Sequence, residues 1–141
     1  MPKNPNQLFP MFLTSDLALT RTFYTEKLGF KATLEAKEYL QLVSDEADGA
    51  ELCFMAPHTD KQGREWRPFS GEGVIVSVPT RNADEKYARL ERAGVKLLAP
   101  PEDKPWGWRS FLAVDPNGIV IDFFHVYKEL TPAELSALAS K

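Results

Sequence analysis

The order of secondary structure predicted for the first half of the chain is repeated in its second half. Residues 7–56 have the pattern of a strand, a helix and three further strands, and residues 73–127 have the same pattern. The halves also match in detail, because Gly29-Phe30 and Gly94-Val95 each end a helix and open a strand. A duplicated unit restricts the fold more than any single motif does. We therefore expect an α+β protein built from two βαβββ modules.

Capping residues and apolar spacing place the elements of the first module. Thr14-Ser15-Asp16 offers N-cap chemistry, and Leu17, Tyr24 and Leu28 share one face of the helix that follows. Pro10 lacks an N–H for a sheet ladder, which indicates that the first strand, residues 7–13, lies at an edge. The remaining strands of this module are expected at about 30–35, 37–44 and 49–56.

The second module has equivalent signals. Asn82-Ala-Asp-Glu85 has the form of a capping box, and Ala83, Tyr87 and Leu90 share one face of the predicted helix. Thr131-Pro-Ala-Glu134 predicts a short C-terminal helix, which we expect to pack as a terminal lid or as a dimer element. Strands are expected at 73–78, 95–98, 109–114 and 119–127, after a polar and irregular linker at 57–72, and the C-terminal segment covers 128–141.

Composition excludes several classes of protein. A chain of 141 residues is expected to form a single domain, and its formal charge of -3 without a Lys/Arg cluster argues against nucleic-acid binding. No apolar run is long enough for a membrane span, and residues 1–7 lack the apolar core of a signal peptide. The single cysteine, Cys53, is expected to be a buried core residue in a reducing compartment. We expect a cytoplasmic protein.

Four short motifs occur in a characteristic order along the chain. They are Phe23-Tyr24, Leu28-Gly29-Phe30, Trp106-Gly107 and Asp115-Pro-Asn-Gly118. With the duplicated βαβββ pattern, they make residues 7 to 127 resemble the vicinal-oxygen-chelate superfamily, which includes glyoxalase I, extradiol dioxygenases and bleomycin-resistance proteins. The resemblance implies that the two modules form a curved, cup-shaped sheet whose concave face carries the site. It does not decide between an enzyme and a binding protein.

The family's metal-binding pattern is poorly matched in this sequence. Metal-dependent members take His or Gln from the first and fifth strands and carboxylates from the fourth and eighth. The corresponding positions here are Phe9, Gly73 or Val74, Cys53 with Glu51 on the same face, and Asp122. Only Asp122 keeps a carboxylate at its position, and a lone carboxylate does not hold a divalent ion. We therefore expect no metal cofactor.

A non-standard metal site is the alternative. Gln7 lies on the same face of the first strand as Phe9, so a shifted register could bring Gln7 together with Glu51 and Asp122 around a divalent ion. His125 alternates to the opposite face of its strand from Asp122, so it does not add a ligand there. Asp122 itself has two interpretations: it is paired with Arg109 at the floor of the cup, or it meets a cationic or hydrogen-bond-donating ligand.

Without metal ligands, the cup is suited to a flat organic molecule. Trp106 and Trp108 flank Gly107, so on an extended segment they would point the same way and form one aromatic wall. Polar anchors would be Asp122, Arg109 and Glu51. The full set of expected ligand-binding residues is Phe9, Tyr39, Glu51, Trp66, Phe69, Trp106, Trp108, Arg109 and Asp122.

The resemblance is greatest to the metal-free bleomycin- and mitomycin-resistance type of protein. It implies a homodimer, with a strand or module exchanged between subunits, that sequesters a small aromatic or cationic antibiotic-like molecule and has no catalytic residues. The alternative is an enzyme of the same superfamily, a metal-dependent lyase, isomerase or dioxygenase. A third interpretation is a scaffold whose pocket is vestigial.

Overall fold

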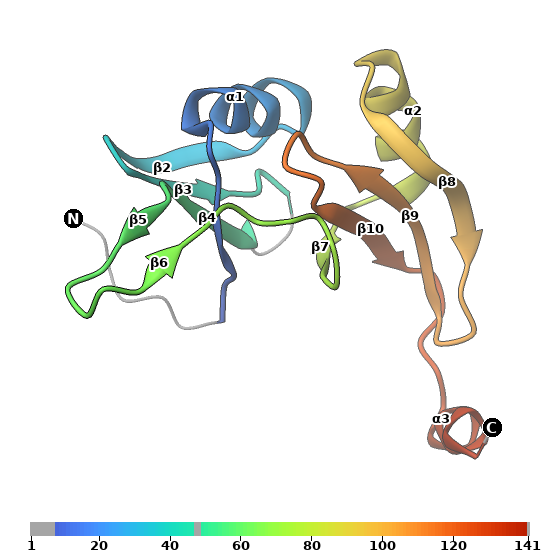
Figure 1. Ribbon diagram of the computed structural model, residues 1–141. Helices are drawn as coiled ribbons and strands as arrows, with labels where there is room; N and C mark the ends of the chain where they lie inside the picture. Colours follow the sequence, from blue (N-terminus) through green and yellow to red (C-terminus); the bar gives the residue numbers. More distant parts are fainter. Residues whose placement is uncertain (1–7, 47–48, 141) are drawn as a thin grey trace. The chain divides into compact units, whose positions relative to one another are not determined.

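The computed structural model describes residues 8–46 and 49–140 (Figure 1). The chain divides into two compact units, with the boundary between Ser70 and Gly71. Each unit contains a four-stranded sheet of mixed parallel and antiparallel strands with a helix packed against it. The prediction of an α+β fold made of two βαβββ modules and a short C-terminal helix is confirmed.

The first sheet joins the two ends of its module by a parallel pair of strands. β1 (Met11–Leu13) pairs in parallel with β4 (Glu51–Met55), while β3 (Tyr39–Val43) pairs antiparallel with both β4 and β2 (Lys31–Ala36). The first strand is shorter than predicted, because the Cys53 N–H donates to the carbonyl of Pro10 and regular pairing begins at Met11. Gln7, where the predicted strand began, lies outside the described residues.

The helix of the first unit begins where its capping residues predict. In α1 (Leu17–Thr22) the Asp16 carboxylate accepts the N–H of Leu19, and the chain continues as one π-helical turn, η1 (Phe23–Lys27). This segment covers one face of the sheet, and the Tyr24 ring lies 5.4 Å from the Phe54 ring between centroids. The side chains that form the core here are almost fully buried: Tyr24, Leu28, Leu40, Leu42, Leu52 and Phe54.

The segment predicted as an irregular linker contains a short hairpin. β5 (His58–Thr59) pairs antiparallel with β6 (Glu65–Trp66), and Asp60 closes the turn by accepting the N–H groups of Gln62 and Arg64 on one carboxylate oxygen. The prediction missed this hairpin because its strands are only two residues long and carry polar side chains, which give no hydrophobic alternation.

The second sheet has the same plan as the first. β7 (Ile75–Pro79) pairs in parallel with β10 (Val120–Val126), and β9 (Trp108–Val114) lies antiparallel between β10 and β8 (Lys96–Asp103). α2 (Ala83–Arg92) covers one face, and the Asn82 side chain accepts the N–H of Glu85. Its core is formed by the buried side chains Val78, Ala83, Leu90, Phe111, Ala113, Ile121 and Phe123.

Two glycine-containing turns shape the second unit. In the Asp115–Gly118 turn, one Asp115 carboxylate oxygen accepts the N–H groups of Asn117 and Ile119, both at 2.8 Å, so this motif builds the entry to β10. In the turn between β8 and β9, Gly107 has a φ of 90°, and its N–H donates to the carbonyl of Lys104.

The C-terminal helix forms as its capping residues predict but packs little. α3 (Pro132–Ala139) has a complete capping box between Thr131 and Glu134, and Pro132 occupies its first turn. None of its side chains is buried, and the expected packing of this helix as a lid or dimer element stays a prediction. Within the described residues, no helix is long and apolar enough to span a bilayer.

Gly107 provides a direct test of how tightly the β8–β9 turn is packed. A Cβ added there would lie 2.1 Å from the carbonyl oxygen of Lys128, in addition to the strain of a positive φ. We expect Gly107→Ala to lower the free energy of unfolding by roughly 3 kcal/mol or more in urea denaturation. The control is Gly63→Ala, which has a similar φ of 83° but no neighbouring atom within 4 Å. Equal losses in the two variants would show that the contact with Lys128 is unimportant.

Candidate functional site

The open face of the second sheet is the face that α2 does not cover. Along β10, Ile121 and Phe123 are buried beneath α2, so Asp122 and Phe124 point to the open face. The register places Ser77 of β7 and Leu112 of β9 beside Asp122. This face therefore carries the Asp122 carboxylate among apolar, aromatic and hydroxyl side chains, while Glu102, the register partner of Ser110, lies on it at the β8 edge and pairs with Lys104.

Two interactions order the open face. The rings of Trp108 and Phe124 stack with centroids 3.9 Å apart and an angle of 10° between their planes. The Ser77 hydroxyl donates to a carboxylate oxygen of Asp122 at 3.0 Å. Ile75 and Val126, which flank these pairs, are 62% and 58% exposed. A flat aromatic surface and a negative charge thus lie on the same side of one sheet.

Sequence reasoning missed Phe124 and Ser77. Phe124 follows Asp122 by two positions on one strand, so strict alternation was a sufficient signal for it. Ser77 lies 45 residues away from Asp122 in the chain, and only the parallel pairing of β7 with β10 brings the two side chains together.

The suggested pairing of Asp122 with Arg109 is wrong. Arg109 lies opposite His125 in the β9–β10 register, and so on the face covered by α2. Its guanidinium binds both carboxylate oxygens of Asp84 at 2.8 and 2.9 Å, and one oxygen of Asp103 at 2.9 Å. These hydrogen bonds raise the pKa of Arg109 and lower the pKa of Asp84. Arg109 therefore joins α2 to β8 and β9 and is not part of the open face.

The expectation that Trp106 and Trp108 form one wall rested on an extended backbone, and that premise is wrong. Lys104 donates its N–H to the carbonyl of Trp108, and Gly107 donates to that of Lys104, so the segment is a tight turn. Trp106 is 49% exposed in this turn, whereas Trp108 lies in β9 and stacks on Phe124. The opposite orientation of His125 and Asp122 is confirmed, because the ring of His125 accepts the N–H of Ala83 at the start of α2.

On the first sheet, the polar candidates lie on the face opposite the helix. Tyr39, Glu51 and Cys53 alternate with the buried leucines of β3 and β4. The Tyr39 hydroxyl donates to the Cys53 sulfur at 3.2 Å, and the Gln41 amide donates to Glu51 at 3.3 Å. Burial, and then this bond, raises the pKa of Tyr39 to about 12, and burial raises the pKa of the Cys53 thiol. The fully buried thiol matches the expected core cysteine.

The remaining aromatic candidates occupy separate positions in the first unit. Phe69 packs edge-on against Phe12 at 5.1 Å and donates its N–H to the carbonyl of Leu13, which ties the end of the linker to β1. Phe9 is half-buried just before β1. Trp66 lies in the hairpin, where its indole N–H donates to Asp60 at 2.9 Å, and this bond lowers the pKa of Asp60.

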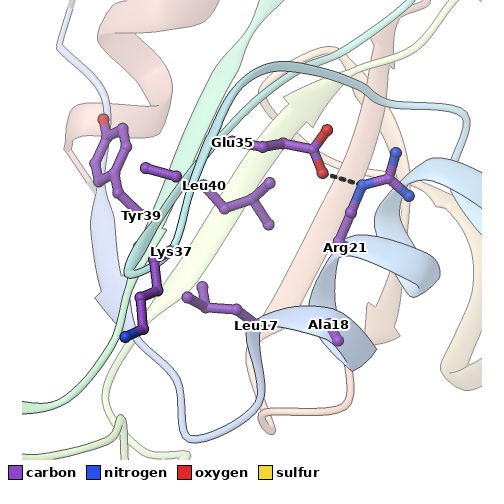
Figure 2. A pocket seen from close by; sticks show the side chains of 8 residues that line it. Leu17, Ala18, Arg21, Glu35, Lys37, Tyr39 and Leu40 are labelled. Carbon is purple, nitrogen blue, oxygen red and sulfur yellow. Dashed lines mark hydrogen bonds and ion pairs between the residues drawn. The ribbon is translucent and has the colours of Figure 1, made fainter.

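A hollow of about 270 Å³ also opens beside α1, at the ends of β2 and β3 (Figure 2). Figure 2 shows Arg21 of α1 joined to Glu35 of β2 on one side of it, with Tyr39 on the other side and Lys37 pointing away. Its charged side chains are largely engaged in the Arg21–Glu35 ion pair, so the hollow offers a weaker recognition surface than the open face.

The described residues do not supply the donor set of the metal-dependent members. Among residues 8–46 and 49–140, no three side chains of His, Cys, Asp or Glu lie together in a way that could hold a metal ion. Asp122 is bonded to the Ser77 hydroxyl, and Glu51 is bonded to the Gln41 amide. Gln7, the third candidate ligand of the alternative site, falls outside these residues.

The chain belongs to the Glyoxalase/Bleomycin resistance protein/Dioxygenase superfamily, whose family model matches residues 8–123. Similar solved structures include a glyoxalase/bleomycin resistance protein/dioxygenase from Nocardioides, with 25% identity, a TM-score of 0.68, and coverage of 94% of this chain and 90% of that one. A superfamily member from Sphaerobacter thermophilus has 28% identity and a TM-score of 0.64, with coverage of 82% and 93%.

TnmS3, an antibiotic binding protein from Streptomyces sp. CB03234, is also similar in structure. It is 25% identical to this chain, with a TM-score of 0.64 and coverage of 87% of this chain and 97% of that one. No curated protein matches the chain.

The role of Arg109 can be tested through acid denaturation. Arg109 lowers the pKa of Asp84 in the folded state, so the Arg109–Asp84 pair stabilises the fold above the ordinary aspartate pKa of about 4. This stabilisation is lost as the pH falls through the lowered pKa of Asp84. We expect Arg109→Met to lower the Tm by a few degrees at pH 7, and this difference to shrink at pH 2–3. Arg92→Met, which removes an exposed cation from α2, is the control for net charge. A difference independent of pH would contradict the assignment.

Proposed function

We propose that this protein binds a small, planar, positively charged organic molecule of the antibiotic type, without turning it over. The observation that carries the proposal is the open face of the second sheet, where the stacked Trp108–Phe124 pair lies on the same side as the Asp122 carboxylate. An aromatic surface gives a planar ligand a large contact area at a low entropic cost. The carboxylate favours a cation over a neutral ring of the same size.

The chemistry of the open face supports binding over catalysis. Ser77 is the hydrogen-bonding partner of Asp122, which is an arrangement suited to orienting a carboxylate toward a ligand. We propose further that binding uses no metal ion, since the two candidate ligand carboxylates, Glu51 and Asp122, are engaged with neutral hydrogen-bond donors. The similarity to an antibiotic binding protein of the same superfamily agrees with this function.

The proposal is tested by titrating the protein with ethidium, a planar aromatic cation, and with neutral phenanthridine. We expect Asp122→Asn to weaken ethidium binding by about tenfold, equivalent to about 1.4 kcal/mol, because the charge is removed while the shape is kept. Phenanthridine binding should change little. Trp108→Leu should weaken both ligands, since it removes the aromatic surface.

The matched control is Asp103→Asn, which neutralises a carboxylate of the same sheet that pairs with Arg109 on the other face. It should leave ethidium affinity unchanged. Equal effects of Asp122→Asn and Asp103→Asn would overturn the assignment of the open face.

Metal content tests the second part of the proposal. We expect protein purified without chelators to contain well under one divalent ion per chain by inductively coupled plasma mass spectrometry, and ethidium binding to be unchanged after EDTA treatment. A stoichiometric ion that EDTA removes together with binding would favour the metal-dependent alternative.

A further inference from the structure

The β5–β6 hairpin carries two nearly parallel aromatic rings that are not part of the open face of the second sheet. His58 and Trp66 are cross-strand partners, with ring centroids 6.5 Å apart and planes at 20°. A hollow of about 260 Å³ adjoins them, and Pro57 and Pro68 contribute to its wall. Trp66 is 39% exposed, so an aromatic surface of substantial area faces the solvent.

The indole of Trp66 is held in place before any ligand arrives. Its N–H donates to one carboxylate oxygen of Asp60, whose other oxygen accepts the N–H groups of Gln62 and Arg64. The guanidinium of Arg64 lies 4.6 Å from the centre of the indole ring. A ring fixed in this way loses little conformational freedom on binding, which is the condition for a good stacking platform.

Two charged side chains line the hollow, Glu65 and Arg67, and they form an ion pair with each other. The hairpin as a whole, residues 58–67, carries Lys61, Arg64 and Arg67 against Asp60 and Glu65, a net charge of +1 with His58 counted as neutral. Asp60 is engaged by the indole and two backbone N–H groups, so both of its carboxylate oxygens are occupied within the hairpin. Arg67 lines the hollow, and its side chain is 81% exposed.

Arg67 has N–H groups that its ion pair with Glu65 does not use, and these can bind an anionic ligand. A guanidinium carries five N–H groups, and the pair with Glu65 uses Nε and Nη2 on one carboxylate oxygen. Trp66 and Arg67 line the same hollow, so a carboxylate attached to a ring that stacks on Trp66 would lie near the guanidinium of Arg67.

We propose that the β5–β6 hairpin is a second binding site, specific for a planar aromatic carboxylate. The ligand's ring stacks against Trp66 and His58, and its carboxylate pairs with Arg67. This site lies within the first unit and prefers the opposite charge to the open face of the second sheet. It does not depend on the function proposed for Asp122.

The test is a titration of ¹⁵N-labelled protein with 2-naphthoate, followed through the indole N–H signals of the three tryptophans in heteronuclear NMR spectra. The signal of Trp66, assigned by its loss in Trp66→Phe, should shift in a saturable way. Arg67→Gln should weaken 2-naphthoate binding by about three- to fivefold, as expected for an exposed ion pair, and leave the affinity for neutral 2-naphthamide unchanged.

Four variants complete the experiment. His58→Ala should weaken both compounds and His58→Phe should retain both, which separates stacking from loss of the hairpin. Lys61→Gln, a neutralised cation of the same hairpin outside the hollow, should have no effect. Asp122→Asn should leave 2-naphthoate binding unchanged. An unshifted Trp66 signal, or equal effects of Arg67→Gln and Lys61→Gln, would overturn the proposal.

Discussion

The alternation of side chains along β10 is the constraint on which the second unit depends. Ile121 and Phe123 point beneath α2 and are fully buried, so Asp122 and Phe124 must point the other way. Moving the strand by one residue would bury a carboxylate and expose a phenyl ring, which the hydrophobic core does not allow. The same alternation directs Arg109 of β9 to α2, where it meets Asp84. Core packing and the polarity of the open face are therefore consequences of one register.

Turns decide where the other aromatic residues lie. The Asp115 carboxylate accepts two backbone N–H groups and so sets the start of β10, while Asp60 accepts two more and closes the β5–β6 hairpin. In both places the carboxylate fixes the course of the backbone by accepting its N–H groups. Trp66 and Trp106 belong to such connections, whereas Trp108 belongs to a sheet and has its position set by strand pairing.

The fold was predictable from sequence because its signals are local and repeated. Helix caps at Asp16, Asn82 and Thr131, together with apolar periodicity, were enough to place the three helices. The first strand was predicted too long, because an apolar segment does not show where ladder pairing starts. Lys86 is almost fully buried with its amine 5.1 Å from the centre of the Phe123 ring, and a hydrophobic pattern cannot predict a buried lysine.

The candidate site was less predictable because it depends on pairs of residues far apart in the chain. Asp122 was identified from its motif, but its partner Ser77 and the true partners of Arg109 follow only from sheet register. The side chains to which we assign the charge preference of the two proposed sites, Asp122 in one unit and Arg67 in the other, are absent from the buried core. They can therefore change during evolution at little cost to folding, whereas the core and turn residues cannot. This separation explains how one fold family can include both enzymes and binding proteins.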